Sequence, residues 1–215
     1  MPPFVNRQQA GTLLAQLINP EDLPSRGLVL ALPRGGVPVA LPLARHLGWP
    51  LELALVRKLG VPQQPELAFG AIALGGIQIL NTDIIRLCHL SPEAMAQVIS
   101  AEKQELERRR HKYLGQRTPL SWQGQNLMLV DDGVATGATL KAAIALAQKQ
   151  KPQKLIVAVP VMAQKTAAAI TPLVAQLVVL ETPLNLNNIG QWYQDFSQVE
   201  DEEVSQLMSL ATGLN

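Results

Sequence analysis

The chain has 215 residues, of which 47% are hydrophobic and 16% charged, a composition that indicates a well-packed globular protein and excludes a disordered one. Eighteen Lys and Arg against 17 Asp and Glu leave a formal charge of +1, which supplies no broad electrostatic footprint for nucleic acid or an anionic membrane. Cys88 is the only cysteine, which excludes an internal disulfide and a multi-cysteine metal cluster and favours a cytoplasmic protein.

The first part of the chain predicts a helix, a strand and a second helix. Apolar residues at i, i+3, i+4 and i+7 from Ala10 predict an amphipathic helix over residues 6–18, with Asn6 and Gln9 as a cap pair. The apolar run 28–32 predicts a buried strand. The N-terminus lacks the features of a signal peptide, and no apolar run approaches about 18 residues, so neither export nor a membrane span is expected.

A glycine-containing turn, P R G G V P over residues 33–38, leads from this strand into the second helix. Its paired glycines allow a backbone to approach an anion closely, and Arg34 adds a cation with bidentate geometry. Taken alone, such a turn is more often an exposed structural feature.

Residues 51–56 predict a second buried strand, with Arg57 and Lys58 at its carboxyl end. These cations are either solvated surface or ligands at the sheet edge where other loops gather. Residues 60–65 have the composition of a mobile loop, and Glu66 to Leu80 alternates around two glycines, which predicts a β-hairpin. This segment is either a lid over a site or a decorative hairpin.

Ser91 and Pro92 mark the start of a long helix. Residues 108–112 are all basic, but three glutamates precede or adjoin them, so we interpret this run as a solvated helix face rather than a nucleic-acid patch. The three histidines of the chain are isolated and show no metal-ligand spacing: His46, His89 and His111.

Residues 125–141, Q N L M L V D D G V A T G A T L K, are the most informative stretch. An apolar run predicts a strand buried on both faces, and Asp131 and Asp132 follow at its carboxyl end, where ligands bind in open α/β sheets. The small-residue loop 133–139 then runs into a helix, whose N-terminal N–H groups suit a phosphate. Because carboxylates suit hydroxyls or a bound cation, a sugar phosphate is the simplest ligand that satisfies both.

Two other phosphate loops fail on spacing. The triphosphate P-loop needs a Lys directly after its second glycine, whereas here Gly137 is followed by Ala138 and the next Lys is Lys141. The dinucleotide fingerprint G x G x x G is absent.

The segment L M L V D D G V A T G A T resembles the 5-phosphoribosyl-1-diphosphate (PRPP) motif of the type I phosphoribosyltransferases. Gly133 and Ala138 depart from many relatives, which carry a branched residue and a glycine, but neither change removes a side chain that the chemistry uses. With R K L G V P Q Q P E L A F G A I A and G Q W Y Q D F S Q V E D E E V, the chain resembles an orphan bacterial group of predicted phosphoribosyltransferases over nearly its whole length.

The expected fold is a doubly wound, mainly parallel α/β sheet. Apolar runs at 155–161 and 177–180 continue the sheet, with a helix near 164–171 between them. The resemblance implies a single phosphoribosyltransferase-like domain over 1–215, with a small hood or hairpin subdomain drawn from 60–81 and 181–200.

The resemblance also implies the roles of the site residues. The 5-phosphate would lie on the loop Ala135, Thr136, Gly137, Ala138 and Thr139. Asp131 and Asp132 would accept hydrogen bonds from the ribose hydroxyls and serve Mg²⁺ mainly through PRPP and water. The pyrophosphate would be bound by Arg34, Gly35, Gly36, Arg57 and Lys58, with Lys58 the preferred catalytic cation.

The tail is the most aromatic stretch of the chain. Trp192, Tyr193 and Asp195 would either bind the acceptor or anchor the tail to the core. Ser197 and Glu200 have the spacing of a capping box before a last helix.

The implied activity is transfer of the 5-phosphoribosyl group from PRPP to a nitrogenous acceptor such as a nucleobase, with release of pyrophosphate, in a homodimer. The alternative is a PRPP-sensing regulator without turnover. A PRPP-synthesising kinase is disfavoured because the chain shows no separate ATP signature.

Overall fold

The computed structural model describes residues 3–211, except for the side chains of Pro65 and Glu66. A five-stranded sheet forms its centre, and each pair of neighbouring strands is parallel. The strand order is β2 (Leu51–Leu53), β1 (Leu28–Ala31), β6 (Asn126–Val130), β7 (Lys154–Val161) and β8 (Gln176–Glu181). Every residue of β1 and β6 is buried, as expected of strands covered on both faces.

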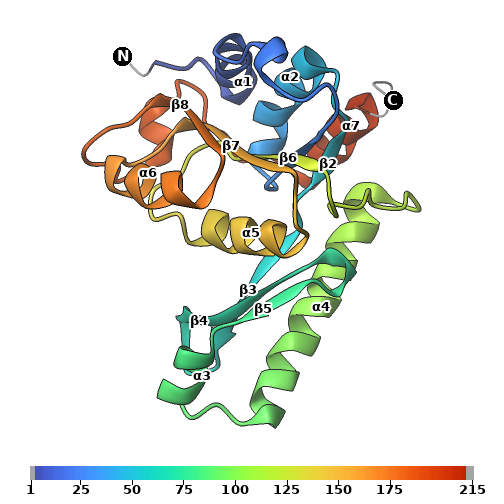
Figure 1. Cartoon of the computed structure of the whole chain (residues 1–215), viewed down its shortest axis with the longest axis vertical. Coiled ribbons are helices and arrows are strands. Elements are labelled where there is room, and N and C mark those ends of the chain that lie inside the picture. The colour runs from blue at the N-terminus through green and yellow to red at the C-terminus, as the bar shows by residue number, and fades with distance from the viewer. Residues whose placement is uncertain (1–2, 212–215) are drawn as a thin grey trace.

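Helices cover both faces of this sheet (Figure 1). On one side lie α1 (Arg7–Gln16), α2 (Gly36–Leu47) and α7 (Asp201–Ala211), and on the other α5 (Ala138–Lys149) and α6 (Gln164–Ile170). Side chains alternate along β1, so Val29 and Ala31 join the hydrophobic core under α2, whereas Leu28 and Leu30 join the core under α5. The predicted doubly wound sheet is confirmed.

A second, antiparallel sheet forms a separate lobe next to α5 (Figure 1). We call it the antiparallel lobe; it contains β3 (Val56–Val61), β4 (Gln64–Ala73), β5 (Gln78–Leu80), α3 (Thr82–Leu87) and α4 (Pro92–Leu114). The predicted hairpin around the two glycines is confirmed as β4–β5, whose turn η2 (Leu74–Gly76) holds Gly75 and Gly76 at φ of 79° and 75°. The segment 181–200 lies elsewhere, beside α1 (Figure 1).

The expected strand over residues 51–56 was wrong in its extent. β2 ends at Leu53, and the chain crosses to the second sheet, where β3 begins at Val56. Ala54 and Leu55 are buried in this crossover, so the apolar run continues although the sheet changes. Residues 60–65 form the end of the β3–β4 hairpin.

The predicted helix starts largely agree with the structure. Asn6 caps α1 by accepting from the Gln9 N–H at 2.9 Å, and the Gln9 side chain accepts from the Val5 N–H at 2.9 Å. Ser91 caps α4 through the Ala94 N–H at 3.2 Å. A short η1 (Pro20–Asp22) follows α1.

The capping box predicted at Ser197 and Glu200 is not formed. The Ser197 N–H donates to the Asp195 carboxylate at 2.9 Å, and the helix begins later, at Asp201. The other short helical turns are η3 (Thr171–Leu173) and η4 (Ile189–Trp192).

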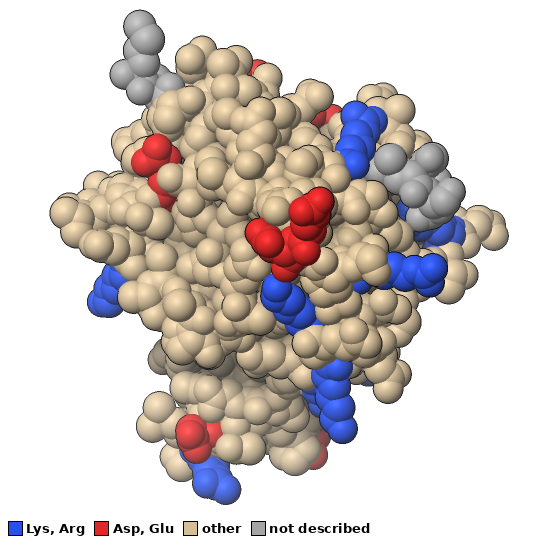
Figure 2. All heavy atoms as spheres, turned by 45° about the horizontal axis from the view of Figure 1, so that its top comes forward, with Lys and Arg blue, Asp and Glu red and all other residues tan. Residues whose placement is uncertain are grey.

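Charged side chains are spread over the surface. On the face in Figure 2, acidic and basic residues are interspersed among large uncharged areas, and no broad basic patch is visible there. In α4, Glu105 pairs with Arg108 and Arg109, and Glu107 pairs with Arg110. Arg108 is exposed, as predicted for a solvated helix face, whereas Arg109 and Arg110 are half-buried. Within residues 3–211, no helix combines the length and the apolar character needed to cross a bilayer.

Candidate functional site

The centre of the site lies where the strand order reverses. β1 and β6 are neighbours, with Ala31 opposite Val130, but β1 is followed along the chain by β2 on one side and β6 by β7 on the other. The loops after β1 and β6 therefore leave the carboxyl ends of adjacent strands in opposite directions. In open α/β sheets, this switch point is the position of the ligand crevice.

Gly35 and Gly36 pack directly against the Asp pair. A Cβ on Gly35 would collide with the Asp132 carboxylate, and a Cβ on Gly36 would lie 2.6 Å from the Val130 carbonyl oxygen. Gly35 is the N-cap of α2 and Gly36 its first residue, and the Pro33–Arg34 peptide bond is cis. The two loops thus approach each other as closely as glycine allows.

The loop after β6 turns into α5 through Gly137, which has a φ of 75° and is the N-cap of the helix. The Ala135 carbonyl accepts from the Thr166 hydroxyl at 2.5 Å, which fixes the middle of the loop on α6. Thr136, Ala138 and Thr139 are exposed. Since the first N–H groups of a helix have no intrahelical partner, this end of α5 suits an anion.

Asp131 and Asp132 are both largely enclosed. Asp131 accepts the Asp132 N–H at 2.9 Å. Burial, followed by the neighbouring Asp132 charge, raises the pKa of Asp131 well above its usual range. Burial also raises the pKa of Asp132, while Arg7 opposes that rise. The pair is arranged to receive hydroxyl donors or a cation.

Arg7, the first residue of α1, contacts this pair. Its Nε donates to Asp132 Oδ2 at 2.7 Å, and the two side chains are only 11% and 13% exposed. Nothing in the sequence pointed to Arg7, because its partner lies 125 residues away and no local spacing indicates the contact.

Tyr193, like Arg7, contacts Asp132. It is buried, its hydroxyl donates to the Asp132 carbonyl at 2.5 Å, and its ring packs on Phe4 and Phe196 with centroids 5.3 and 5.0 Å away. Tyr193 therefore anchors the tail to the core, one of the two roles that the sequence left open. Trp192 is half-buried and Asp195 exposed nearby.

The predicted cations lie at different places around the loops. Arg34 is 3.6 Å from Glu200 and 3.7 Å from Asp201 at the start of α7. Arg57 and Lys58 are consecutive in β3 and so point to opposite faces of its sheet.

The Arg57 Nε bonds Glu102 of α4 at 2.5 Å. Lys58 lines a groove with Ala138 and Lys141 of α5 and so lies on the side of the loop that follows β6.

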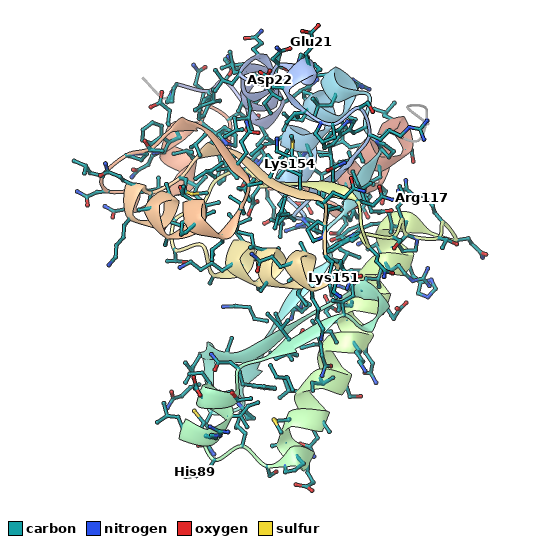
Figure 3. All side chains as sticks on the ribbon, in the orientation of Figure 1. Glu21, Asp22, His89, Arg117, Lys151 and Lys154 are labelled. Atoms are coloured by element: carbon teal, nitrogen blue, oxygen red, sulfur yellow. The ribbon has the colours of Figure 1, made fainter. Side chains whose placement is uncertain are left out.

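Arg109 belongs to the basic run that we interpreted as a solvated helix face, but it is half-buried. With Pro33 and Thr139, Arg109 lines a small cavity that reaches from the loop after β1 to α5. His89 lies at the far end of the antiparallel lobe, away from the site (Figure 3). Among residues 3–211, no group of three or more His, Cys, Asp or Glu is placed to hold a metal ion by itself.

Comparisons with known proteins point in one direction. The family model of the phosphoribosyl transferase domain matches residues 7–181. A Mycobacterium tuberculosis H37Rv protein named "Putative phosphoribosyl transferase Rv0571c" is 42% identical over 202 residues, which are 94% of this chain and 45% of that protein. The match to its counterpart in strain CDC 1551 has the same figures. The chain thus spans about half the length of the curated relatives it matches.

The crystal structure of TT1426 from Thermus thermophilus is 36% identical to this chain and superimposes with a TM-score of 0.85. The match covers 95% of this chain and 97% of that one. The two folds therefore agree over almost their whole lengths.

Proposed function

The chain belongs to the phosphoribosyl transferase domain family, and on that basis we propose that it transfers the 5-phosphoribosyl group of PRPP to a nitrogenous acceptor. The observation that carries the proposal is the meeting of two loops at one switch point. One supplies adjacent carboxylates and a helix N-terminus, and the other supplies paired glycines and Arg34.

In the proposed reaction, the acceptor nitrogen forms a bond to C1 of the ribose while the bond from C1 to the pyrophosphate oxygen breaks. The electron pair of that bond leaves with pyrophosphate, and the acceptor nitrogen gives up its proton to solvent. Positive charge develops on the ribose ring in the transition state. Asp131 and Asp132 would lie beside the ribose, where as carboxylates they would stabilise this charge and accept the ribose hydroxyls, and the positive charge would oppose the rise that burial causes in their pKa.

The phosphates would lie on either side of the ribose. The 5-phosphate would accept hydrogen bonds from the backbone N–H groups of residues 135–139 and from the hydroxyls of Thr136 and Thr139. The pyrophosphate would lie on the loop at Gly35 and Gly36, with Arg34 as one cation and either Lys58 or Arg57, which point to opposite faces of β3, as the second.

Mg²⁺ fits this arrangement, because it is usually bound by one or two carboxylates together with substrate phosphates and water. Asp131 and Asp132 would hold it mainly through PRPP and water, and its charge would help to neutralise the departing pyrophosphate. A homodimer is a prediction from the sequence resemblance, and analytical ultracentrifugation would test it.

The test is pyrophosphate release from PRPP and Mg²⁺ across a panel of purines, pyrimidines and small nitrogenous acceptors. The double variant Asp131→Asn with Asp132→Asn should lose about 100-fold or more in turnover while keeping its circular dichroism spectrum. A matched control is Glu21→Gln with Asp22→Asn, an adjacent acidic pair that is exposed in η1, at the top of the view in Figure 3.

The outcomes separate the alternatives. Turnover with one acceptor, lost in the Asn pair and kept in the control, supports the transferase and names its acceptor class. Unchanged turnover in the Asn pair would remove these carboxylates from the reaction. PRPP that raises the melting temperature without turnover on any acceptor would favour the PRPP-sensing regulator.

A further inference from the structure

The carboxylate of Asp132 is held by groups that lie outside both loops. Arg7 donates to its Oδ2 from α1, and Tyr193 donates to its backbone carbonyl from the tail. Gly35 packs against the Asp132 carboxylate, and any side chain at position 35 would collide with that carboxylate. We call Arg7, Tyr193 and Phe196 the Asp132 clasp.

Arg7 is itself fixed in place. Its Nη1 donates to the Ser197 carbonyl at 2.8 Å, and its guanidinium lies 3.8 Å from the centroid of the Phe196 ring. The tail is in turn joined to the N-terminal segment, since the Gln194 and Asp195 N–H groups donate to the Phe4 and Val5 carbonyls.

An exposed ion pair with mobile side chains contributes little to a structure. The pair of Arg7 and Asp132 differs, because both side chains are nearly enclosed and the guanidinium has a second hydrogen bond and an aromatic face. Its geometry is therefore defined, and it limits the orientations that the Asp132 carboxylate adopts.

We propose that Arg7 is a positioning residue that orients the Asp132 carboxylate toward the ribose hydroxyls of the phosphoribosyl ligand. The inference rests on the proposed function and adds to it a residue outside both ligand loops. Arg7 acts through Asp132. Its contribution is therefore confined to ligands that offer hydroxyls to that carboxylate.

Ribose 5-phosphate and tetrahydrofurfuryl phosphate form a suitable ligand pair, because the second keeps the five-membered ring and the phosphate but lacks the ring hydroxyls. Arg7→Met removes the cation, and Arg7→Lys keeps the charge without the planar fork. Arg45→Met, at an exposed position in the last turn of α2, is the control. Circular dichroism shows which variants are folded. If Arg7→Met does not fold, the comparison of the two ligands is made with Arg7→Lys.

Isothermal titration calorimetry should show that Arg7→Met binds ribose 5-phosphate about tenfold or more weakly, with Arg7→Lys intermediate and Arg45→Met unchanged. The affinity for tetrahydrofurfuryl phosphate should change less than about twofold in every variant, since the phosphate loop is untouched. This difference between the ligands supports the positioning role.

Two results would overturn it. Equal losses for both ligands would mean that Arg7 only supports the fold, and the proposed function would survive. If the wild-type protein bound neither ribose 5-phosphate nor PRPP, the proposed function would be overturned, and the role of Arg7 with it.

Discussion

Replacement of Gly36 by alanine tests how tightly the loop after β1 packs against β6. Gly36 is the first residue of α2, and its φ lies outside the left-handed region, so the backbone itself accepts alanine. In an ordinary helix the change would stabilise the protein by about 0.5–1 kcal/mol. Here the new Cβ would lie 2.6 Å from the Val130 carbonyl oxygen and 3.1 Å from the Asp131 Cα.

The size of the effect follows from what must move. The first distance is 0.8 Å short of the 3.4 Å at which ordinary contact begins, since 3.4 minus 2.6 is 0.8. Both contacted atoms are backbone, at the end of a central strand that is buried on both faces. Overpacking of this kind costs typically about 1–3 kcal/mol, which outweighs the helical gain. We expect Gly36→Ala to unfold with about 2 kcal/mol less free energy and a melting temperature roughly 4–8 °C lower.

Gly35→Ala is the matched comparison, because its Cβ meets the Asp132 side chain instead of backbone. Asp132 would have to move away from Arg7, so PRPP affinity should fall about tenfold, and thermal stability should fall through loss of the enclosed Arg7–Asp132 pair instead of through a displaced strand. Urea denaturation and differential scanning calorimetry measure the stability, and titration calorimetry measures the affinity. A Gly36→Ala protein as stable as wild type would refute the packing argument.

Two further predictions concern groups outside the site. Glu52 is 1% exposed and accepts from the Leu53 and Leu120 N–H groups and from Arg117, which lies near the end of α4 (Figure 3). Glu52→Ala leaves these donors without their carboxylate and should cost about 3 kcal/mol in urea denaturation, and an unchanged midpoint would contradict this. Burial, followed by the hydrogen bond to Asp201, raises the pKa of Tyr113 to about 12. Because the folded state favours the neutral phenol, its stabilisation is complete below about pH 10 and is lost as the pH rises from there through 12. A phenolate absorbance titration of wild type minus Tyr113→Phe should show this midpoint, and a value near 10 would contradict it.

The parts of the fold and site that could be predicted are those encoded locally. Residues 127–139 contain a buried strand, the acids and the start of a helix in one continuous pattern. Because ligands bind at the carboxyl ends of parallel strands, this loop could be predicted to lie near the Pro33–Gly36 turn before any contact between the two was known.

The parts that could not be predicted depend on distant packing. The sequence L E L A L V is continuously apolar apart from one glutamate, so it does not show that Leu53 ends one strand and Val56 begins another in a different sheet. At the tail, Ser197 and Glu200 have capping-box spacing, but Arg7 binds the Ser197 carbonyl and the Ser197 N–H turns back to Asp195.

The Asp132 clasp has a consequence for the order in which the protein folds. Its bond from Arg7 to the Ser197 carbonyl joins residues 190 positions apart, and closure of such a long loop is favourable only once other contacts bring its ends together. Pulse-labelled hydrogen exchange during refolding should therefore protect the amides of β6 before those of residues 193–197. The loop after β6 would then form early, and a chain that lacks its last segments would have this turn without the tail contacts that hold Arg7 against Asp132.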